Sequence, residues 1–150
     1  MVRNETDSPK SAASHSLESL MATRRVDAWI LCLPESDREP DATFLHLDWR
    51  FRGAIARALQ AGAISRESGE VSLIPCTRPV SDSGRETFRI LTLGVNDRRN
   101  VSTQEMAKLA KNVDGLGLKS IGFSASDFGW SASEAKRHFP KGRAELWVTE

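Results

Sequence analysis

The chain has 150 residues, which suits one domain with a single core and leaves no room for a second domain of ordinary size. Its 21 basic and 20 acidic residues give a net charge of +1, which argues against long-range attraction of nucleic acid or of an anionic membrane. No stretch approaches the roughly 20 apolar residues that cross a bilayer, and no apolar segment near the N-terminus is typical of a signal peptide. We therefore expect a cytoplasmic protein without a membrane partner.

The N-terminal segment, residues 1–22, is rich in small polar and charged side chains and has few apolar ones. Ordering such a segment costs more conformational entropy than its burial recovers. We therefore predict a disordered tail over residues 1–22, in which residues 16–21 could form one helical turn, and a single domain over residues 23–150.

Short apolar runs recur along the rest of the chain. Residues 26–33 are almost continuously apolar, which predicts a strand covered on both faces. Further strands are predicted at residues 71–76, 88–93, 120–123 and 144–148, and the first two of these are expected to form a hairpin.

Helix signals lie between the predicted strands. Asp48 is predicted to cap a helix that runs to about Ala61. Ser102 and Glu105 have the spacing of a capping box, in which each side chain accepts a hydrogen bond from the other residue's backbone N–H, and the same spacing recurs at 131–134. The alternation of strands and helices predicts a three-layer α/β/α fold with a mixed, mainly parallel sheet.

Three segments in this order resemble the N-terminal domain of the leucyl aminopeptidase family: residues 47–50 (LDWR) with the helix that follows, residues 69–75 (GEVSLIP) and residues 88–94 (FRILTLG). The resemblance covers about residues 24–150. It implies a macro-domain-like fold, with the family's two-metal peptidase site in a separate C-terminal domain that is missing here.

No cluster of Asp, Glu and His falls on one predicted face, so no catalytic residue of that family can be assigned, and we expect neither a metal nor a cofactor. The leading hypothesis is a non-catalytic interaction or regulatory module. It would dock onto a protein partner or onto a second copy of itself.

A small-molecule binder of the macro-domain type, for nucleotides or ADP-ribose-like ligands, is the alternative. Ligands of open α/β sheets usually bind at the carboxyl ends of the strands, where backbone N–H groups hold anions and aromatic rings stack on bases. The candidate residues follow the third and fourth predicted strands: Gly94, Val95, Asn96, Ser124, Ser126, Asp127, Phe128 and Trp130. In the competing interpretation the glycine serves a turn and the aromatic rings cap the core.

The first predicted strand argues against ADP-ribose itself. Residues 26–28 are similar to the corresponding strand of macro domains. Residues 31–34 (LCLP) then replace the Asn-rich end of that strand, and no Gly-Gly stretch follows.

Several arginines could contact the phosphates of nucleic acid, so a DNA-binding accessory protein is the second alternative. They are Arg50, Arg52, Arg57, Arg66, Arg98 and Arg99. Acidic residues are interspersed among them, as on an ordinary solvated surface, and we rank nucleic acid below a protein partner.

The cysteines and histidines do not indicate a reactive site. Cys32 and Cys76 lie in apolar runs and are predicted to be buried free thiols, with a disulfide left open if their strands pair. His15, His46 and His138 lie far apart along the chain, which favours structural or surface roles over metal binding.

Overall fold

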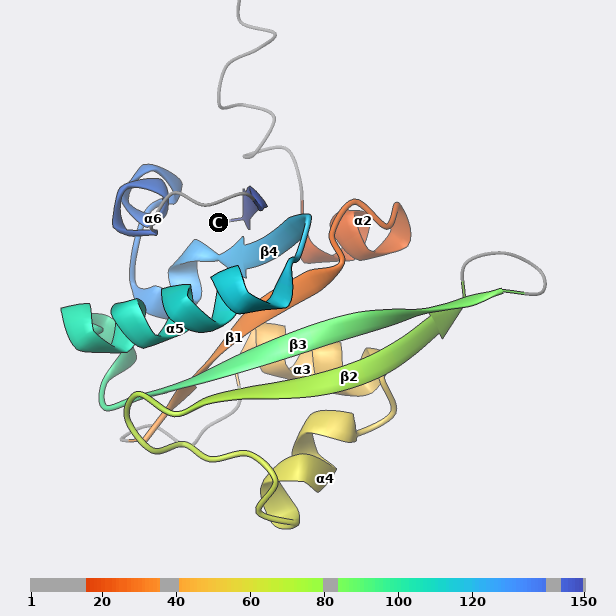
Figure 1. Ribbon diagram of the computed structural model, residues 1–150, viewed down its shortest axis with the longest axis horizontal. Coiled ribbons are helices and arrows are strands. Elements are labelled where there is room, and N and C mark those ends of the chain that lie inside the picture. The colour runs from red at the N-terminus through yellow and green to blue at the C-terminus, as the bar shows by residue number, and fades with distance from the viewer. Residues whose placement is uncertain (1–15, 36–40, 80–83, 140–143, 150) are drawn as a thin grey trace, which may run out of the picture.

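A five-stranded sheet lies between two layers of helices (Figure 1). The computed structural model describes residues 16–35, 41–79, 84–139 and 144–149. The strands are β1 (Ala28–Pro34), β2 (Val71–Pro79), β3 (Arg85–Val95), β4 (Ser120–Ser124) and β5 (Glu145–Thr149), in the order β2-β3-β1-β4-β5. β2 is antiparallel to β3 and the other pairs are parallel. This confirms the predicted α/β/α fold, the mainly parallel sheet and the hairpin.

Different helices cover the two faces of the sheet. α5 (Thr103–Leu116) and α6 (Ala132–His138) pack on one face, and α2 (Leu17–Ala22), α3 (Ala42–Arg50) and α4 (Ala54–Gln60) pack on the other. Every residue of the central strand β1 is buried, as its continuous apolar run predicts. Within the described ranges, none of these helices has the length and apolar character that crossing a bilayer requires.

The helix predicted to begin at Asp48 is in fact two helices, so this prediction is wrong. α3 begins earlier, where Asp41 accepts a 2.8 Å hydrogen bond from the backbone N–H of Phe44. Asp48 lies inside α3, and its Oδ1 accepts hydrogen bonds from the backbone N–H groups of Ile55 and Ala56 at 2.9 and 3.0 Å. Asp48 therefore caps α4, one element later than its position suggests.

The break between α3 and α4 comes from two residues in the left-handed region. Arg52 has φ 58° and Gly53 has φ 79°. A backbone in this region cannot continue a right-handed helix, and a non-glycine residue adopts it rarely. The Arg57 side chain donates a hydrogen bond to the Arg52 carbonyl, which ties α4 to the break.

The folded body begins before residue 23. Ser16 and Ser19 form a capping box at the start of α2, and Leu20 and Met21 are buried against the core. The end of the predicted tail is therefore helical, because its few apolar residues fall on one side of a short helix. Residues 1–15 lie outside the described part of the chain.

The two cysteines face opposite layers. Cys32 packs with the residues that contact α5, whereas Cys76 packs with those that contact α3 and α4. Both are buried and free, which confirms the predicted thiols and settles the question of a disulfide between them.

Candidate ligand site at the strand ends

The parallel strands β1, β3 and β4 end at the same edge of the sheet, where Pro34 of β1 lies opposite Val95 of β3. A short 3-10 helix follows each of the other two strands: η2 (Arg98–Asn100) after β3 and η3 (Ala125–Phe128) after β4. These segments lie side by side, since a Cβ built on Gly129 would be 3.6 Å from the Arg99 Cα atom. The two predicted candidate segments, one after each strand, therefore meet in space.

The candidate residues differ in their access to solvent. Asn96 and Ser126 are exposed, and Trp130 is half-buried. The remaining candidates are buried beneath the two loops: Gly94, Val95, Ser124, Asp127 and Phe128. A ligand at this edge could reach the first group directly and the second only through a change in the loops.

Close backbone packing explains why residue 94 is a glycine. Its N–H donates to the Glu70 carbonyl at 2.9 Å, and its own carbonyl accepts from the Gly69 N–H at 2.8 Å. A Cβ at this position would lie 2.1 Å from the Glu67 carbonyl oxygen. The end of β3 is thus pressed against the loop that leads into β2, and this close approach requires glycine without any ligand.

Stacked aromatic rings connect the core to the surface beside η3. Phe123 and Phe128 have ring centroids 4.6 Å apart, and Phe128 and Trp130 have centroids 5.3 Å apart. His138 of α6 stacks on Trp130 at 4.6 Å with an interplanar angle of 22°. Phe128 therefore caps the core, while Trp130 and His138 extend the stack to the surface.

A pocket of about 310 Å³ opens beside this stack, and we call it the α5 pocket. It is lined by Arg99, Asn100, Val101, Ser102, Thr103, Met106, Trp130 and His138. It combines a guanidinium group, an aromatic surface and the first turn of a 14-residue helix, and no acidic side chain lines it. Of the eight residues predicted for the small-molecule site, only Trp130 lines this pocket, and Arg99, predicted as a possible phosphate contact, lines it as well.

The buried carboxylate of Glu105 fixes the wall of the α5 pocket. It accepts hydrogen bonds from the Ser102 N–H at 2.8 Å, the Asn96 N–H at 3.0 Å and the Ser68 hydroxyl at 2.6 Å. Burial alone would raise the pKa of Glu105, but these hydrogen bonds outweigh it and lower the pKa. The capping-box spacing predicts the bond to Ser102. The other two bonds depend on tertiary structure and were not predicted.

Asp127 is the most strongly perturbed acid at this edge of the sheet. Burial raises its pKa to about 7, and the negative charge of Asp41 adds to this effect, while Thr43 and Arg98 act against it. Its Oδ2 atom has no hydrogen-bond partner among the described residues. Asp127 thus lies beneath the loops, partly protonated near neutral pH, and does not line the α5 pocket.

The thiols of Cys32 and Cys76 are not activated as nucleophiles. Burial raises the pKa of Cys76 to about 11, and burial together with the negative charge of Asp127 raises the pKa of Cys32 far above its ordinary value. A thiol must ionise to react, so both remain neutral at physiological pH. In the described part of the chain, no three His, Cys, Asp or Glu side chains are grouped to hold a metal ion, and His15 lies outside that part.

Known proteins resemble this chain in fold and not in sequence. No protein-family model matches the chain, and no curated protein matches its sequence. Among solved structures, the macrodomain of Thermus aquaticus DarG aligns with a TM-score of 0.54 at 14% identity, over 83% of this chain and 89% of that chain. The chain has a macrodomain-like fold. The likeness does not extend to a relationship with leucyl aminopeptidases, which remains an inference from the sequence.

Proposed function

We propose that this macrodomain-like protein binds a small nucleotide-like ligand of the ADP-ribose class in the α5 pocket. The observation that carries the proposal is the convergence of the Trp130–His138 stack, Arg99 and the start of α5 on one pocket. β1 ends in the apolar residues Leu33 and Pro34, so recognition would rest on the loops after β3 and β4.

The aromatic stack suits a base. A flat ring can stack on any base, and the outer face of His138, which stacks on Trp130, provides such a ring without base-specific hydrogen bonds. The pocket volume of about 310 Å³ lies near the lower end of the range for ligand sites. We therefore propose that one half of a dinucleotide-sized ligand occupies the pocket while the rest stays in solvent.

The phosphates would lie between Arg99 and the first turn of α5. The capping box occupies the backbone N–H groups of Ser102 and Glu105, whereas those of Thr103 and Gln104 have no intrahelical acceptor. Such free N–H groups, together with the helix dipole, favour an anion, and the Arg99 guanidinium adds a full positive charge.

We propose binding without catalysis. Glu105 is saturated with hydrogen bonds, Asp127 lies beneath the loops, and the two thiols are neutral. None of these carboxylates and thiols therefore faces the space where the ligand would lie, and His138, which does line the pocket, stacks on Trp130.

Isothermal titration of ADP-ribose and of AMP against the full chain tests the proposal. We expect Trp130→Leu and Arg99→Gln each to weaken binding by about tenfold, because the first removes the ring that supports His138 and the second removes a charge-assisted contact. Arg137→Gln is the matched control, since Arg137 is exposed on α6 beside His138 and does not line the pocket. Equal affinities for all variants, or no binding by the wild type, would reject the site.

Self-association is the second candidate function, and it corresponds to the interaction module expected from the sequence. Leu45 and Trp49 are 56% and 75% exposed, and they lie one turn apart on α3. We propose that this pair contacts a second copy of the chain. Sedimentation at increasing concentration should then reveal a dimer that Trp49→Ser weakens, and a wild-type monomer throughout would exclude it.

A further inference from the structure

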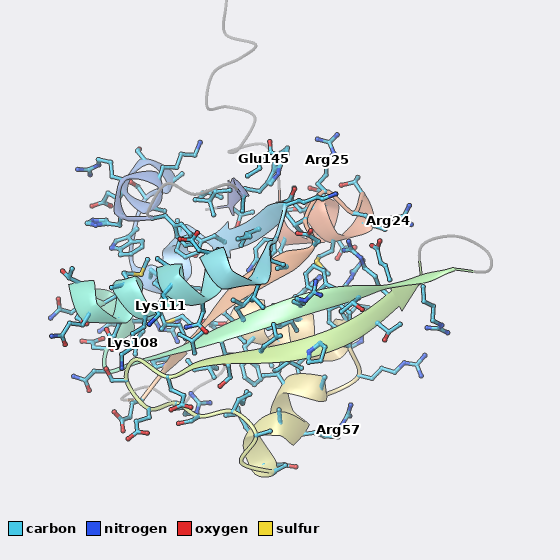
Figure 2. The ribbon with its side chains drawn as sticks, in the orientation of Figure 1. Arg24, Arg25, Arg57, Lys108, Lys111 and Glu145 are labelled. Carbon is cyan, nitrogen blue, oxygen red and sulfur yellow. The ribbon has the colours of Figure 1, made fainter. Side chains whose placement is uncertain are left out.

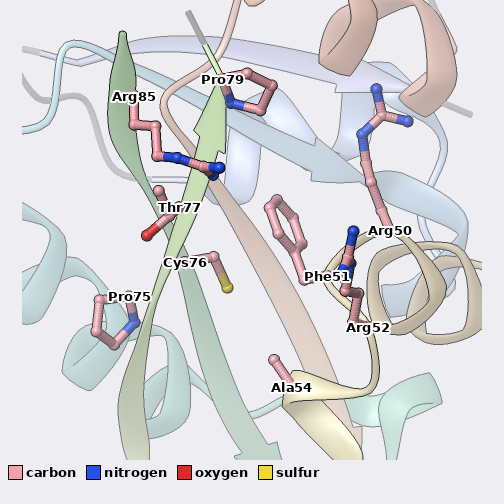
Figure 3. A pocket seen from close by; sticks show the side chains of 9 residues that line it. All are labelled: Arg50, Phe51, Arg52, Ala54, Pro75, Cys76, Thr77, Pro79 and Arg85. Carbon is pink, nitrogen blue, oxygen red and sulfur yellow. The ribbon is translucent and has the colours of Figure 1, made fainter. Parts of the chain in front are cut away.

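A second pocket, of about 450 Å³, lies at the opposite edge of the sheet. It opens between the α3–α4 connection and the end of the β2–β3 hairpin, where Pro79 pairs with Arg85 (Figure 3). Its lining residues are Arg50, Phe51, Arg52, Ala54, Pro75, Cys76, Thr77, Pro79 and Arg85. We call it the arginine pocket. It shares no residue with the α5 pocket.

Positive charge gathers around this pocket without an acidic side chain in its lining. Arg50 ends α3, Arg52 lies in the connection between α3 and α4, and Arg85 comes from the hairpin, across β2 from both (Figure 3). Arg50 lies 3.7 Å from the carboxylate of Glu18, which is 66% exposed, so this ion pair is weak. Neither Arg52 nor Arg85 forms an ion pair with another described residue.

Like charges held around one hollow repel one another, and an anion would relieve that repulsion. Arg52 has a left-handed backbone conformation, with φ 58°. This conformation is rare for a residue other than glycine. It ends α3 early and leaves the Arg52 side chain beside the pocket.

The remaining wall is mostly apolar. Phe51 stacks on Phe88 with centroids 5.4 Å apart and an interplanar angle of 14°. Ala54, Cys76, Thr77 and the two prolines of β2 complete the wall. The pocket thus combines a cationic rim with an apolar surface that can pack against the carbon atoms of a ligand.

We propose that the arginine pocket binds a small molecule that bears phosphate groups. Guanidinium groups bind phosphate through paired hydrogen bonds, and three of them suit a ligand with at least two negative charges. The pocket volume lies within the range of small-molecule sites. This inference does not depend on the function proposed for the α5 pocket.

The test is titration of the full chain with pyrophosphate, with two variants of equal net charge. Arg52→Gln/Arg85→Gln removes two charges from the pocket. Lys108→Gln/Lys111→Gln removes two exposed charges from α5, which covers the other face of the sheet (Figure 2). We expect the arginine variant to bind at least about tenfold more weakly and the lysine variant to stay within about twofold of the wild type. Thermal unfolding of both variants confirms that they fold.

Other outcomes overturn the inference. If the wild type does not bind pyrophosphate, or if both variants lose affinity equally, the arginine pocket is not the site. If Arg99→Gln removes binding while the arginine variant retains it, pyrophosphate binds the α5 pocket instead. Tighter binding of citrate would assign a carboxylate ligand, and tighter binding of a single-stranded oligonucleotide with a steep salt dependence would assign nucleic acid.

Discussion

The guanidinium of Arg98 donates a 3.0 Å hydrogen bond to the carboxylate of Asp41, and this bond joins η2 to the start of α3. Both side chains are largely buried, at 18% and 15% exposed. The same Asp41 carboxylate caps α3 and adds its negative charge to the burial that raises the pKa of Asp127. The edge of the sheet that carries the α5 pocket is therefore built on a buried group of charges.

The first prediction concerns the pH dependence of stability. Because the folded state raises the pKa of Asp127 to about 7, the unfolded chain loses this proton at lower pH than the folded chain does. The contribution of protonated Asp127 to the stability of the fold is complete below the ordinary aspartate pKa, and it is lost as the pH rises to about 7. Relative to Asp127→Asn, we expect the wild-type free energy of unfolding to fall by roughly 2–4 kcal/mol between about pH 4 and pH 8.

Urea titrations of both proteins across this pH range measure the difference. Asp114→Asn, at an exposed position of α5, is the control and should show no such trend. A constant difference between wild type and Asp127→Asn would mean that folding does not raise the pKa of Asp127.

The second prediction concerns close backbone packing. Gly94→Ala places a methyl group against the Glu67 carbonyl and should destabilise the fold by about 2 kcal/mol or more, because backbone on both sides must move. Gly115→Ala is the matched control, since nothing lies within 4 Å of its Cβ position and alanine favours the helix. Denaturation of both variants should give opposite signs, and equal effects would argue against the close approach.

The third prediction concerns the hydrogen bonds of Glu105. Glu105→Ala leaves the Asn96 N–H and the Ser68 hydroxyl without their acceptor and removes half of the capping box. We expect a loss of about 3 kcal/mol at neutral pH. Gln104→Ala, on the exposed side of the same helix turn, should change stability by no more than about 0.5 kcal/mol. Similar effects of the two variants would show that the hydrogen bonds of Glu105 contribute little to stability.

Much of the fold was predictable because its signals are local. The apolar run of β1 and the capping boxes at Ser102 and Ser131 depend on neighbours in the sequence, and the structure contains each of them. The helix start predicted at Asp48 was wrong because this side chain caps α4, which begins after the break at Arg52 and Gly53.

The sites were harder to predict because their residues are distant in the sequence. Trp130 was identified at the end of β4, but Arg99 and His138 join it only through the packing of η2 and α6. The arginine pocket likewise depends on the hairpin that brings Arg85 to the same pocket as Arg50 and Arg52. No spacing rule predicts either assembly.

The most direct test of the proposed function is a nuclear magnetic resonance titration of the isotope-labelled chain with ADP-ribose. We expect the largest shifts at the Trp130 indole N–H and at the backbone N–H groups of Thr103 and Gln104, saturating with a single dissociation constant. Shifts confined to the arginine pocket, or spectra unchanged at millimolar ligand, would contradict ligand binding in the α5 pocket.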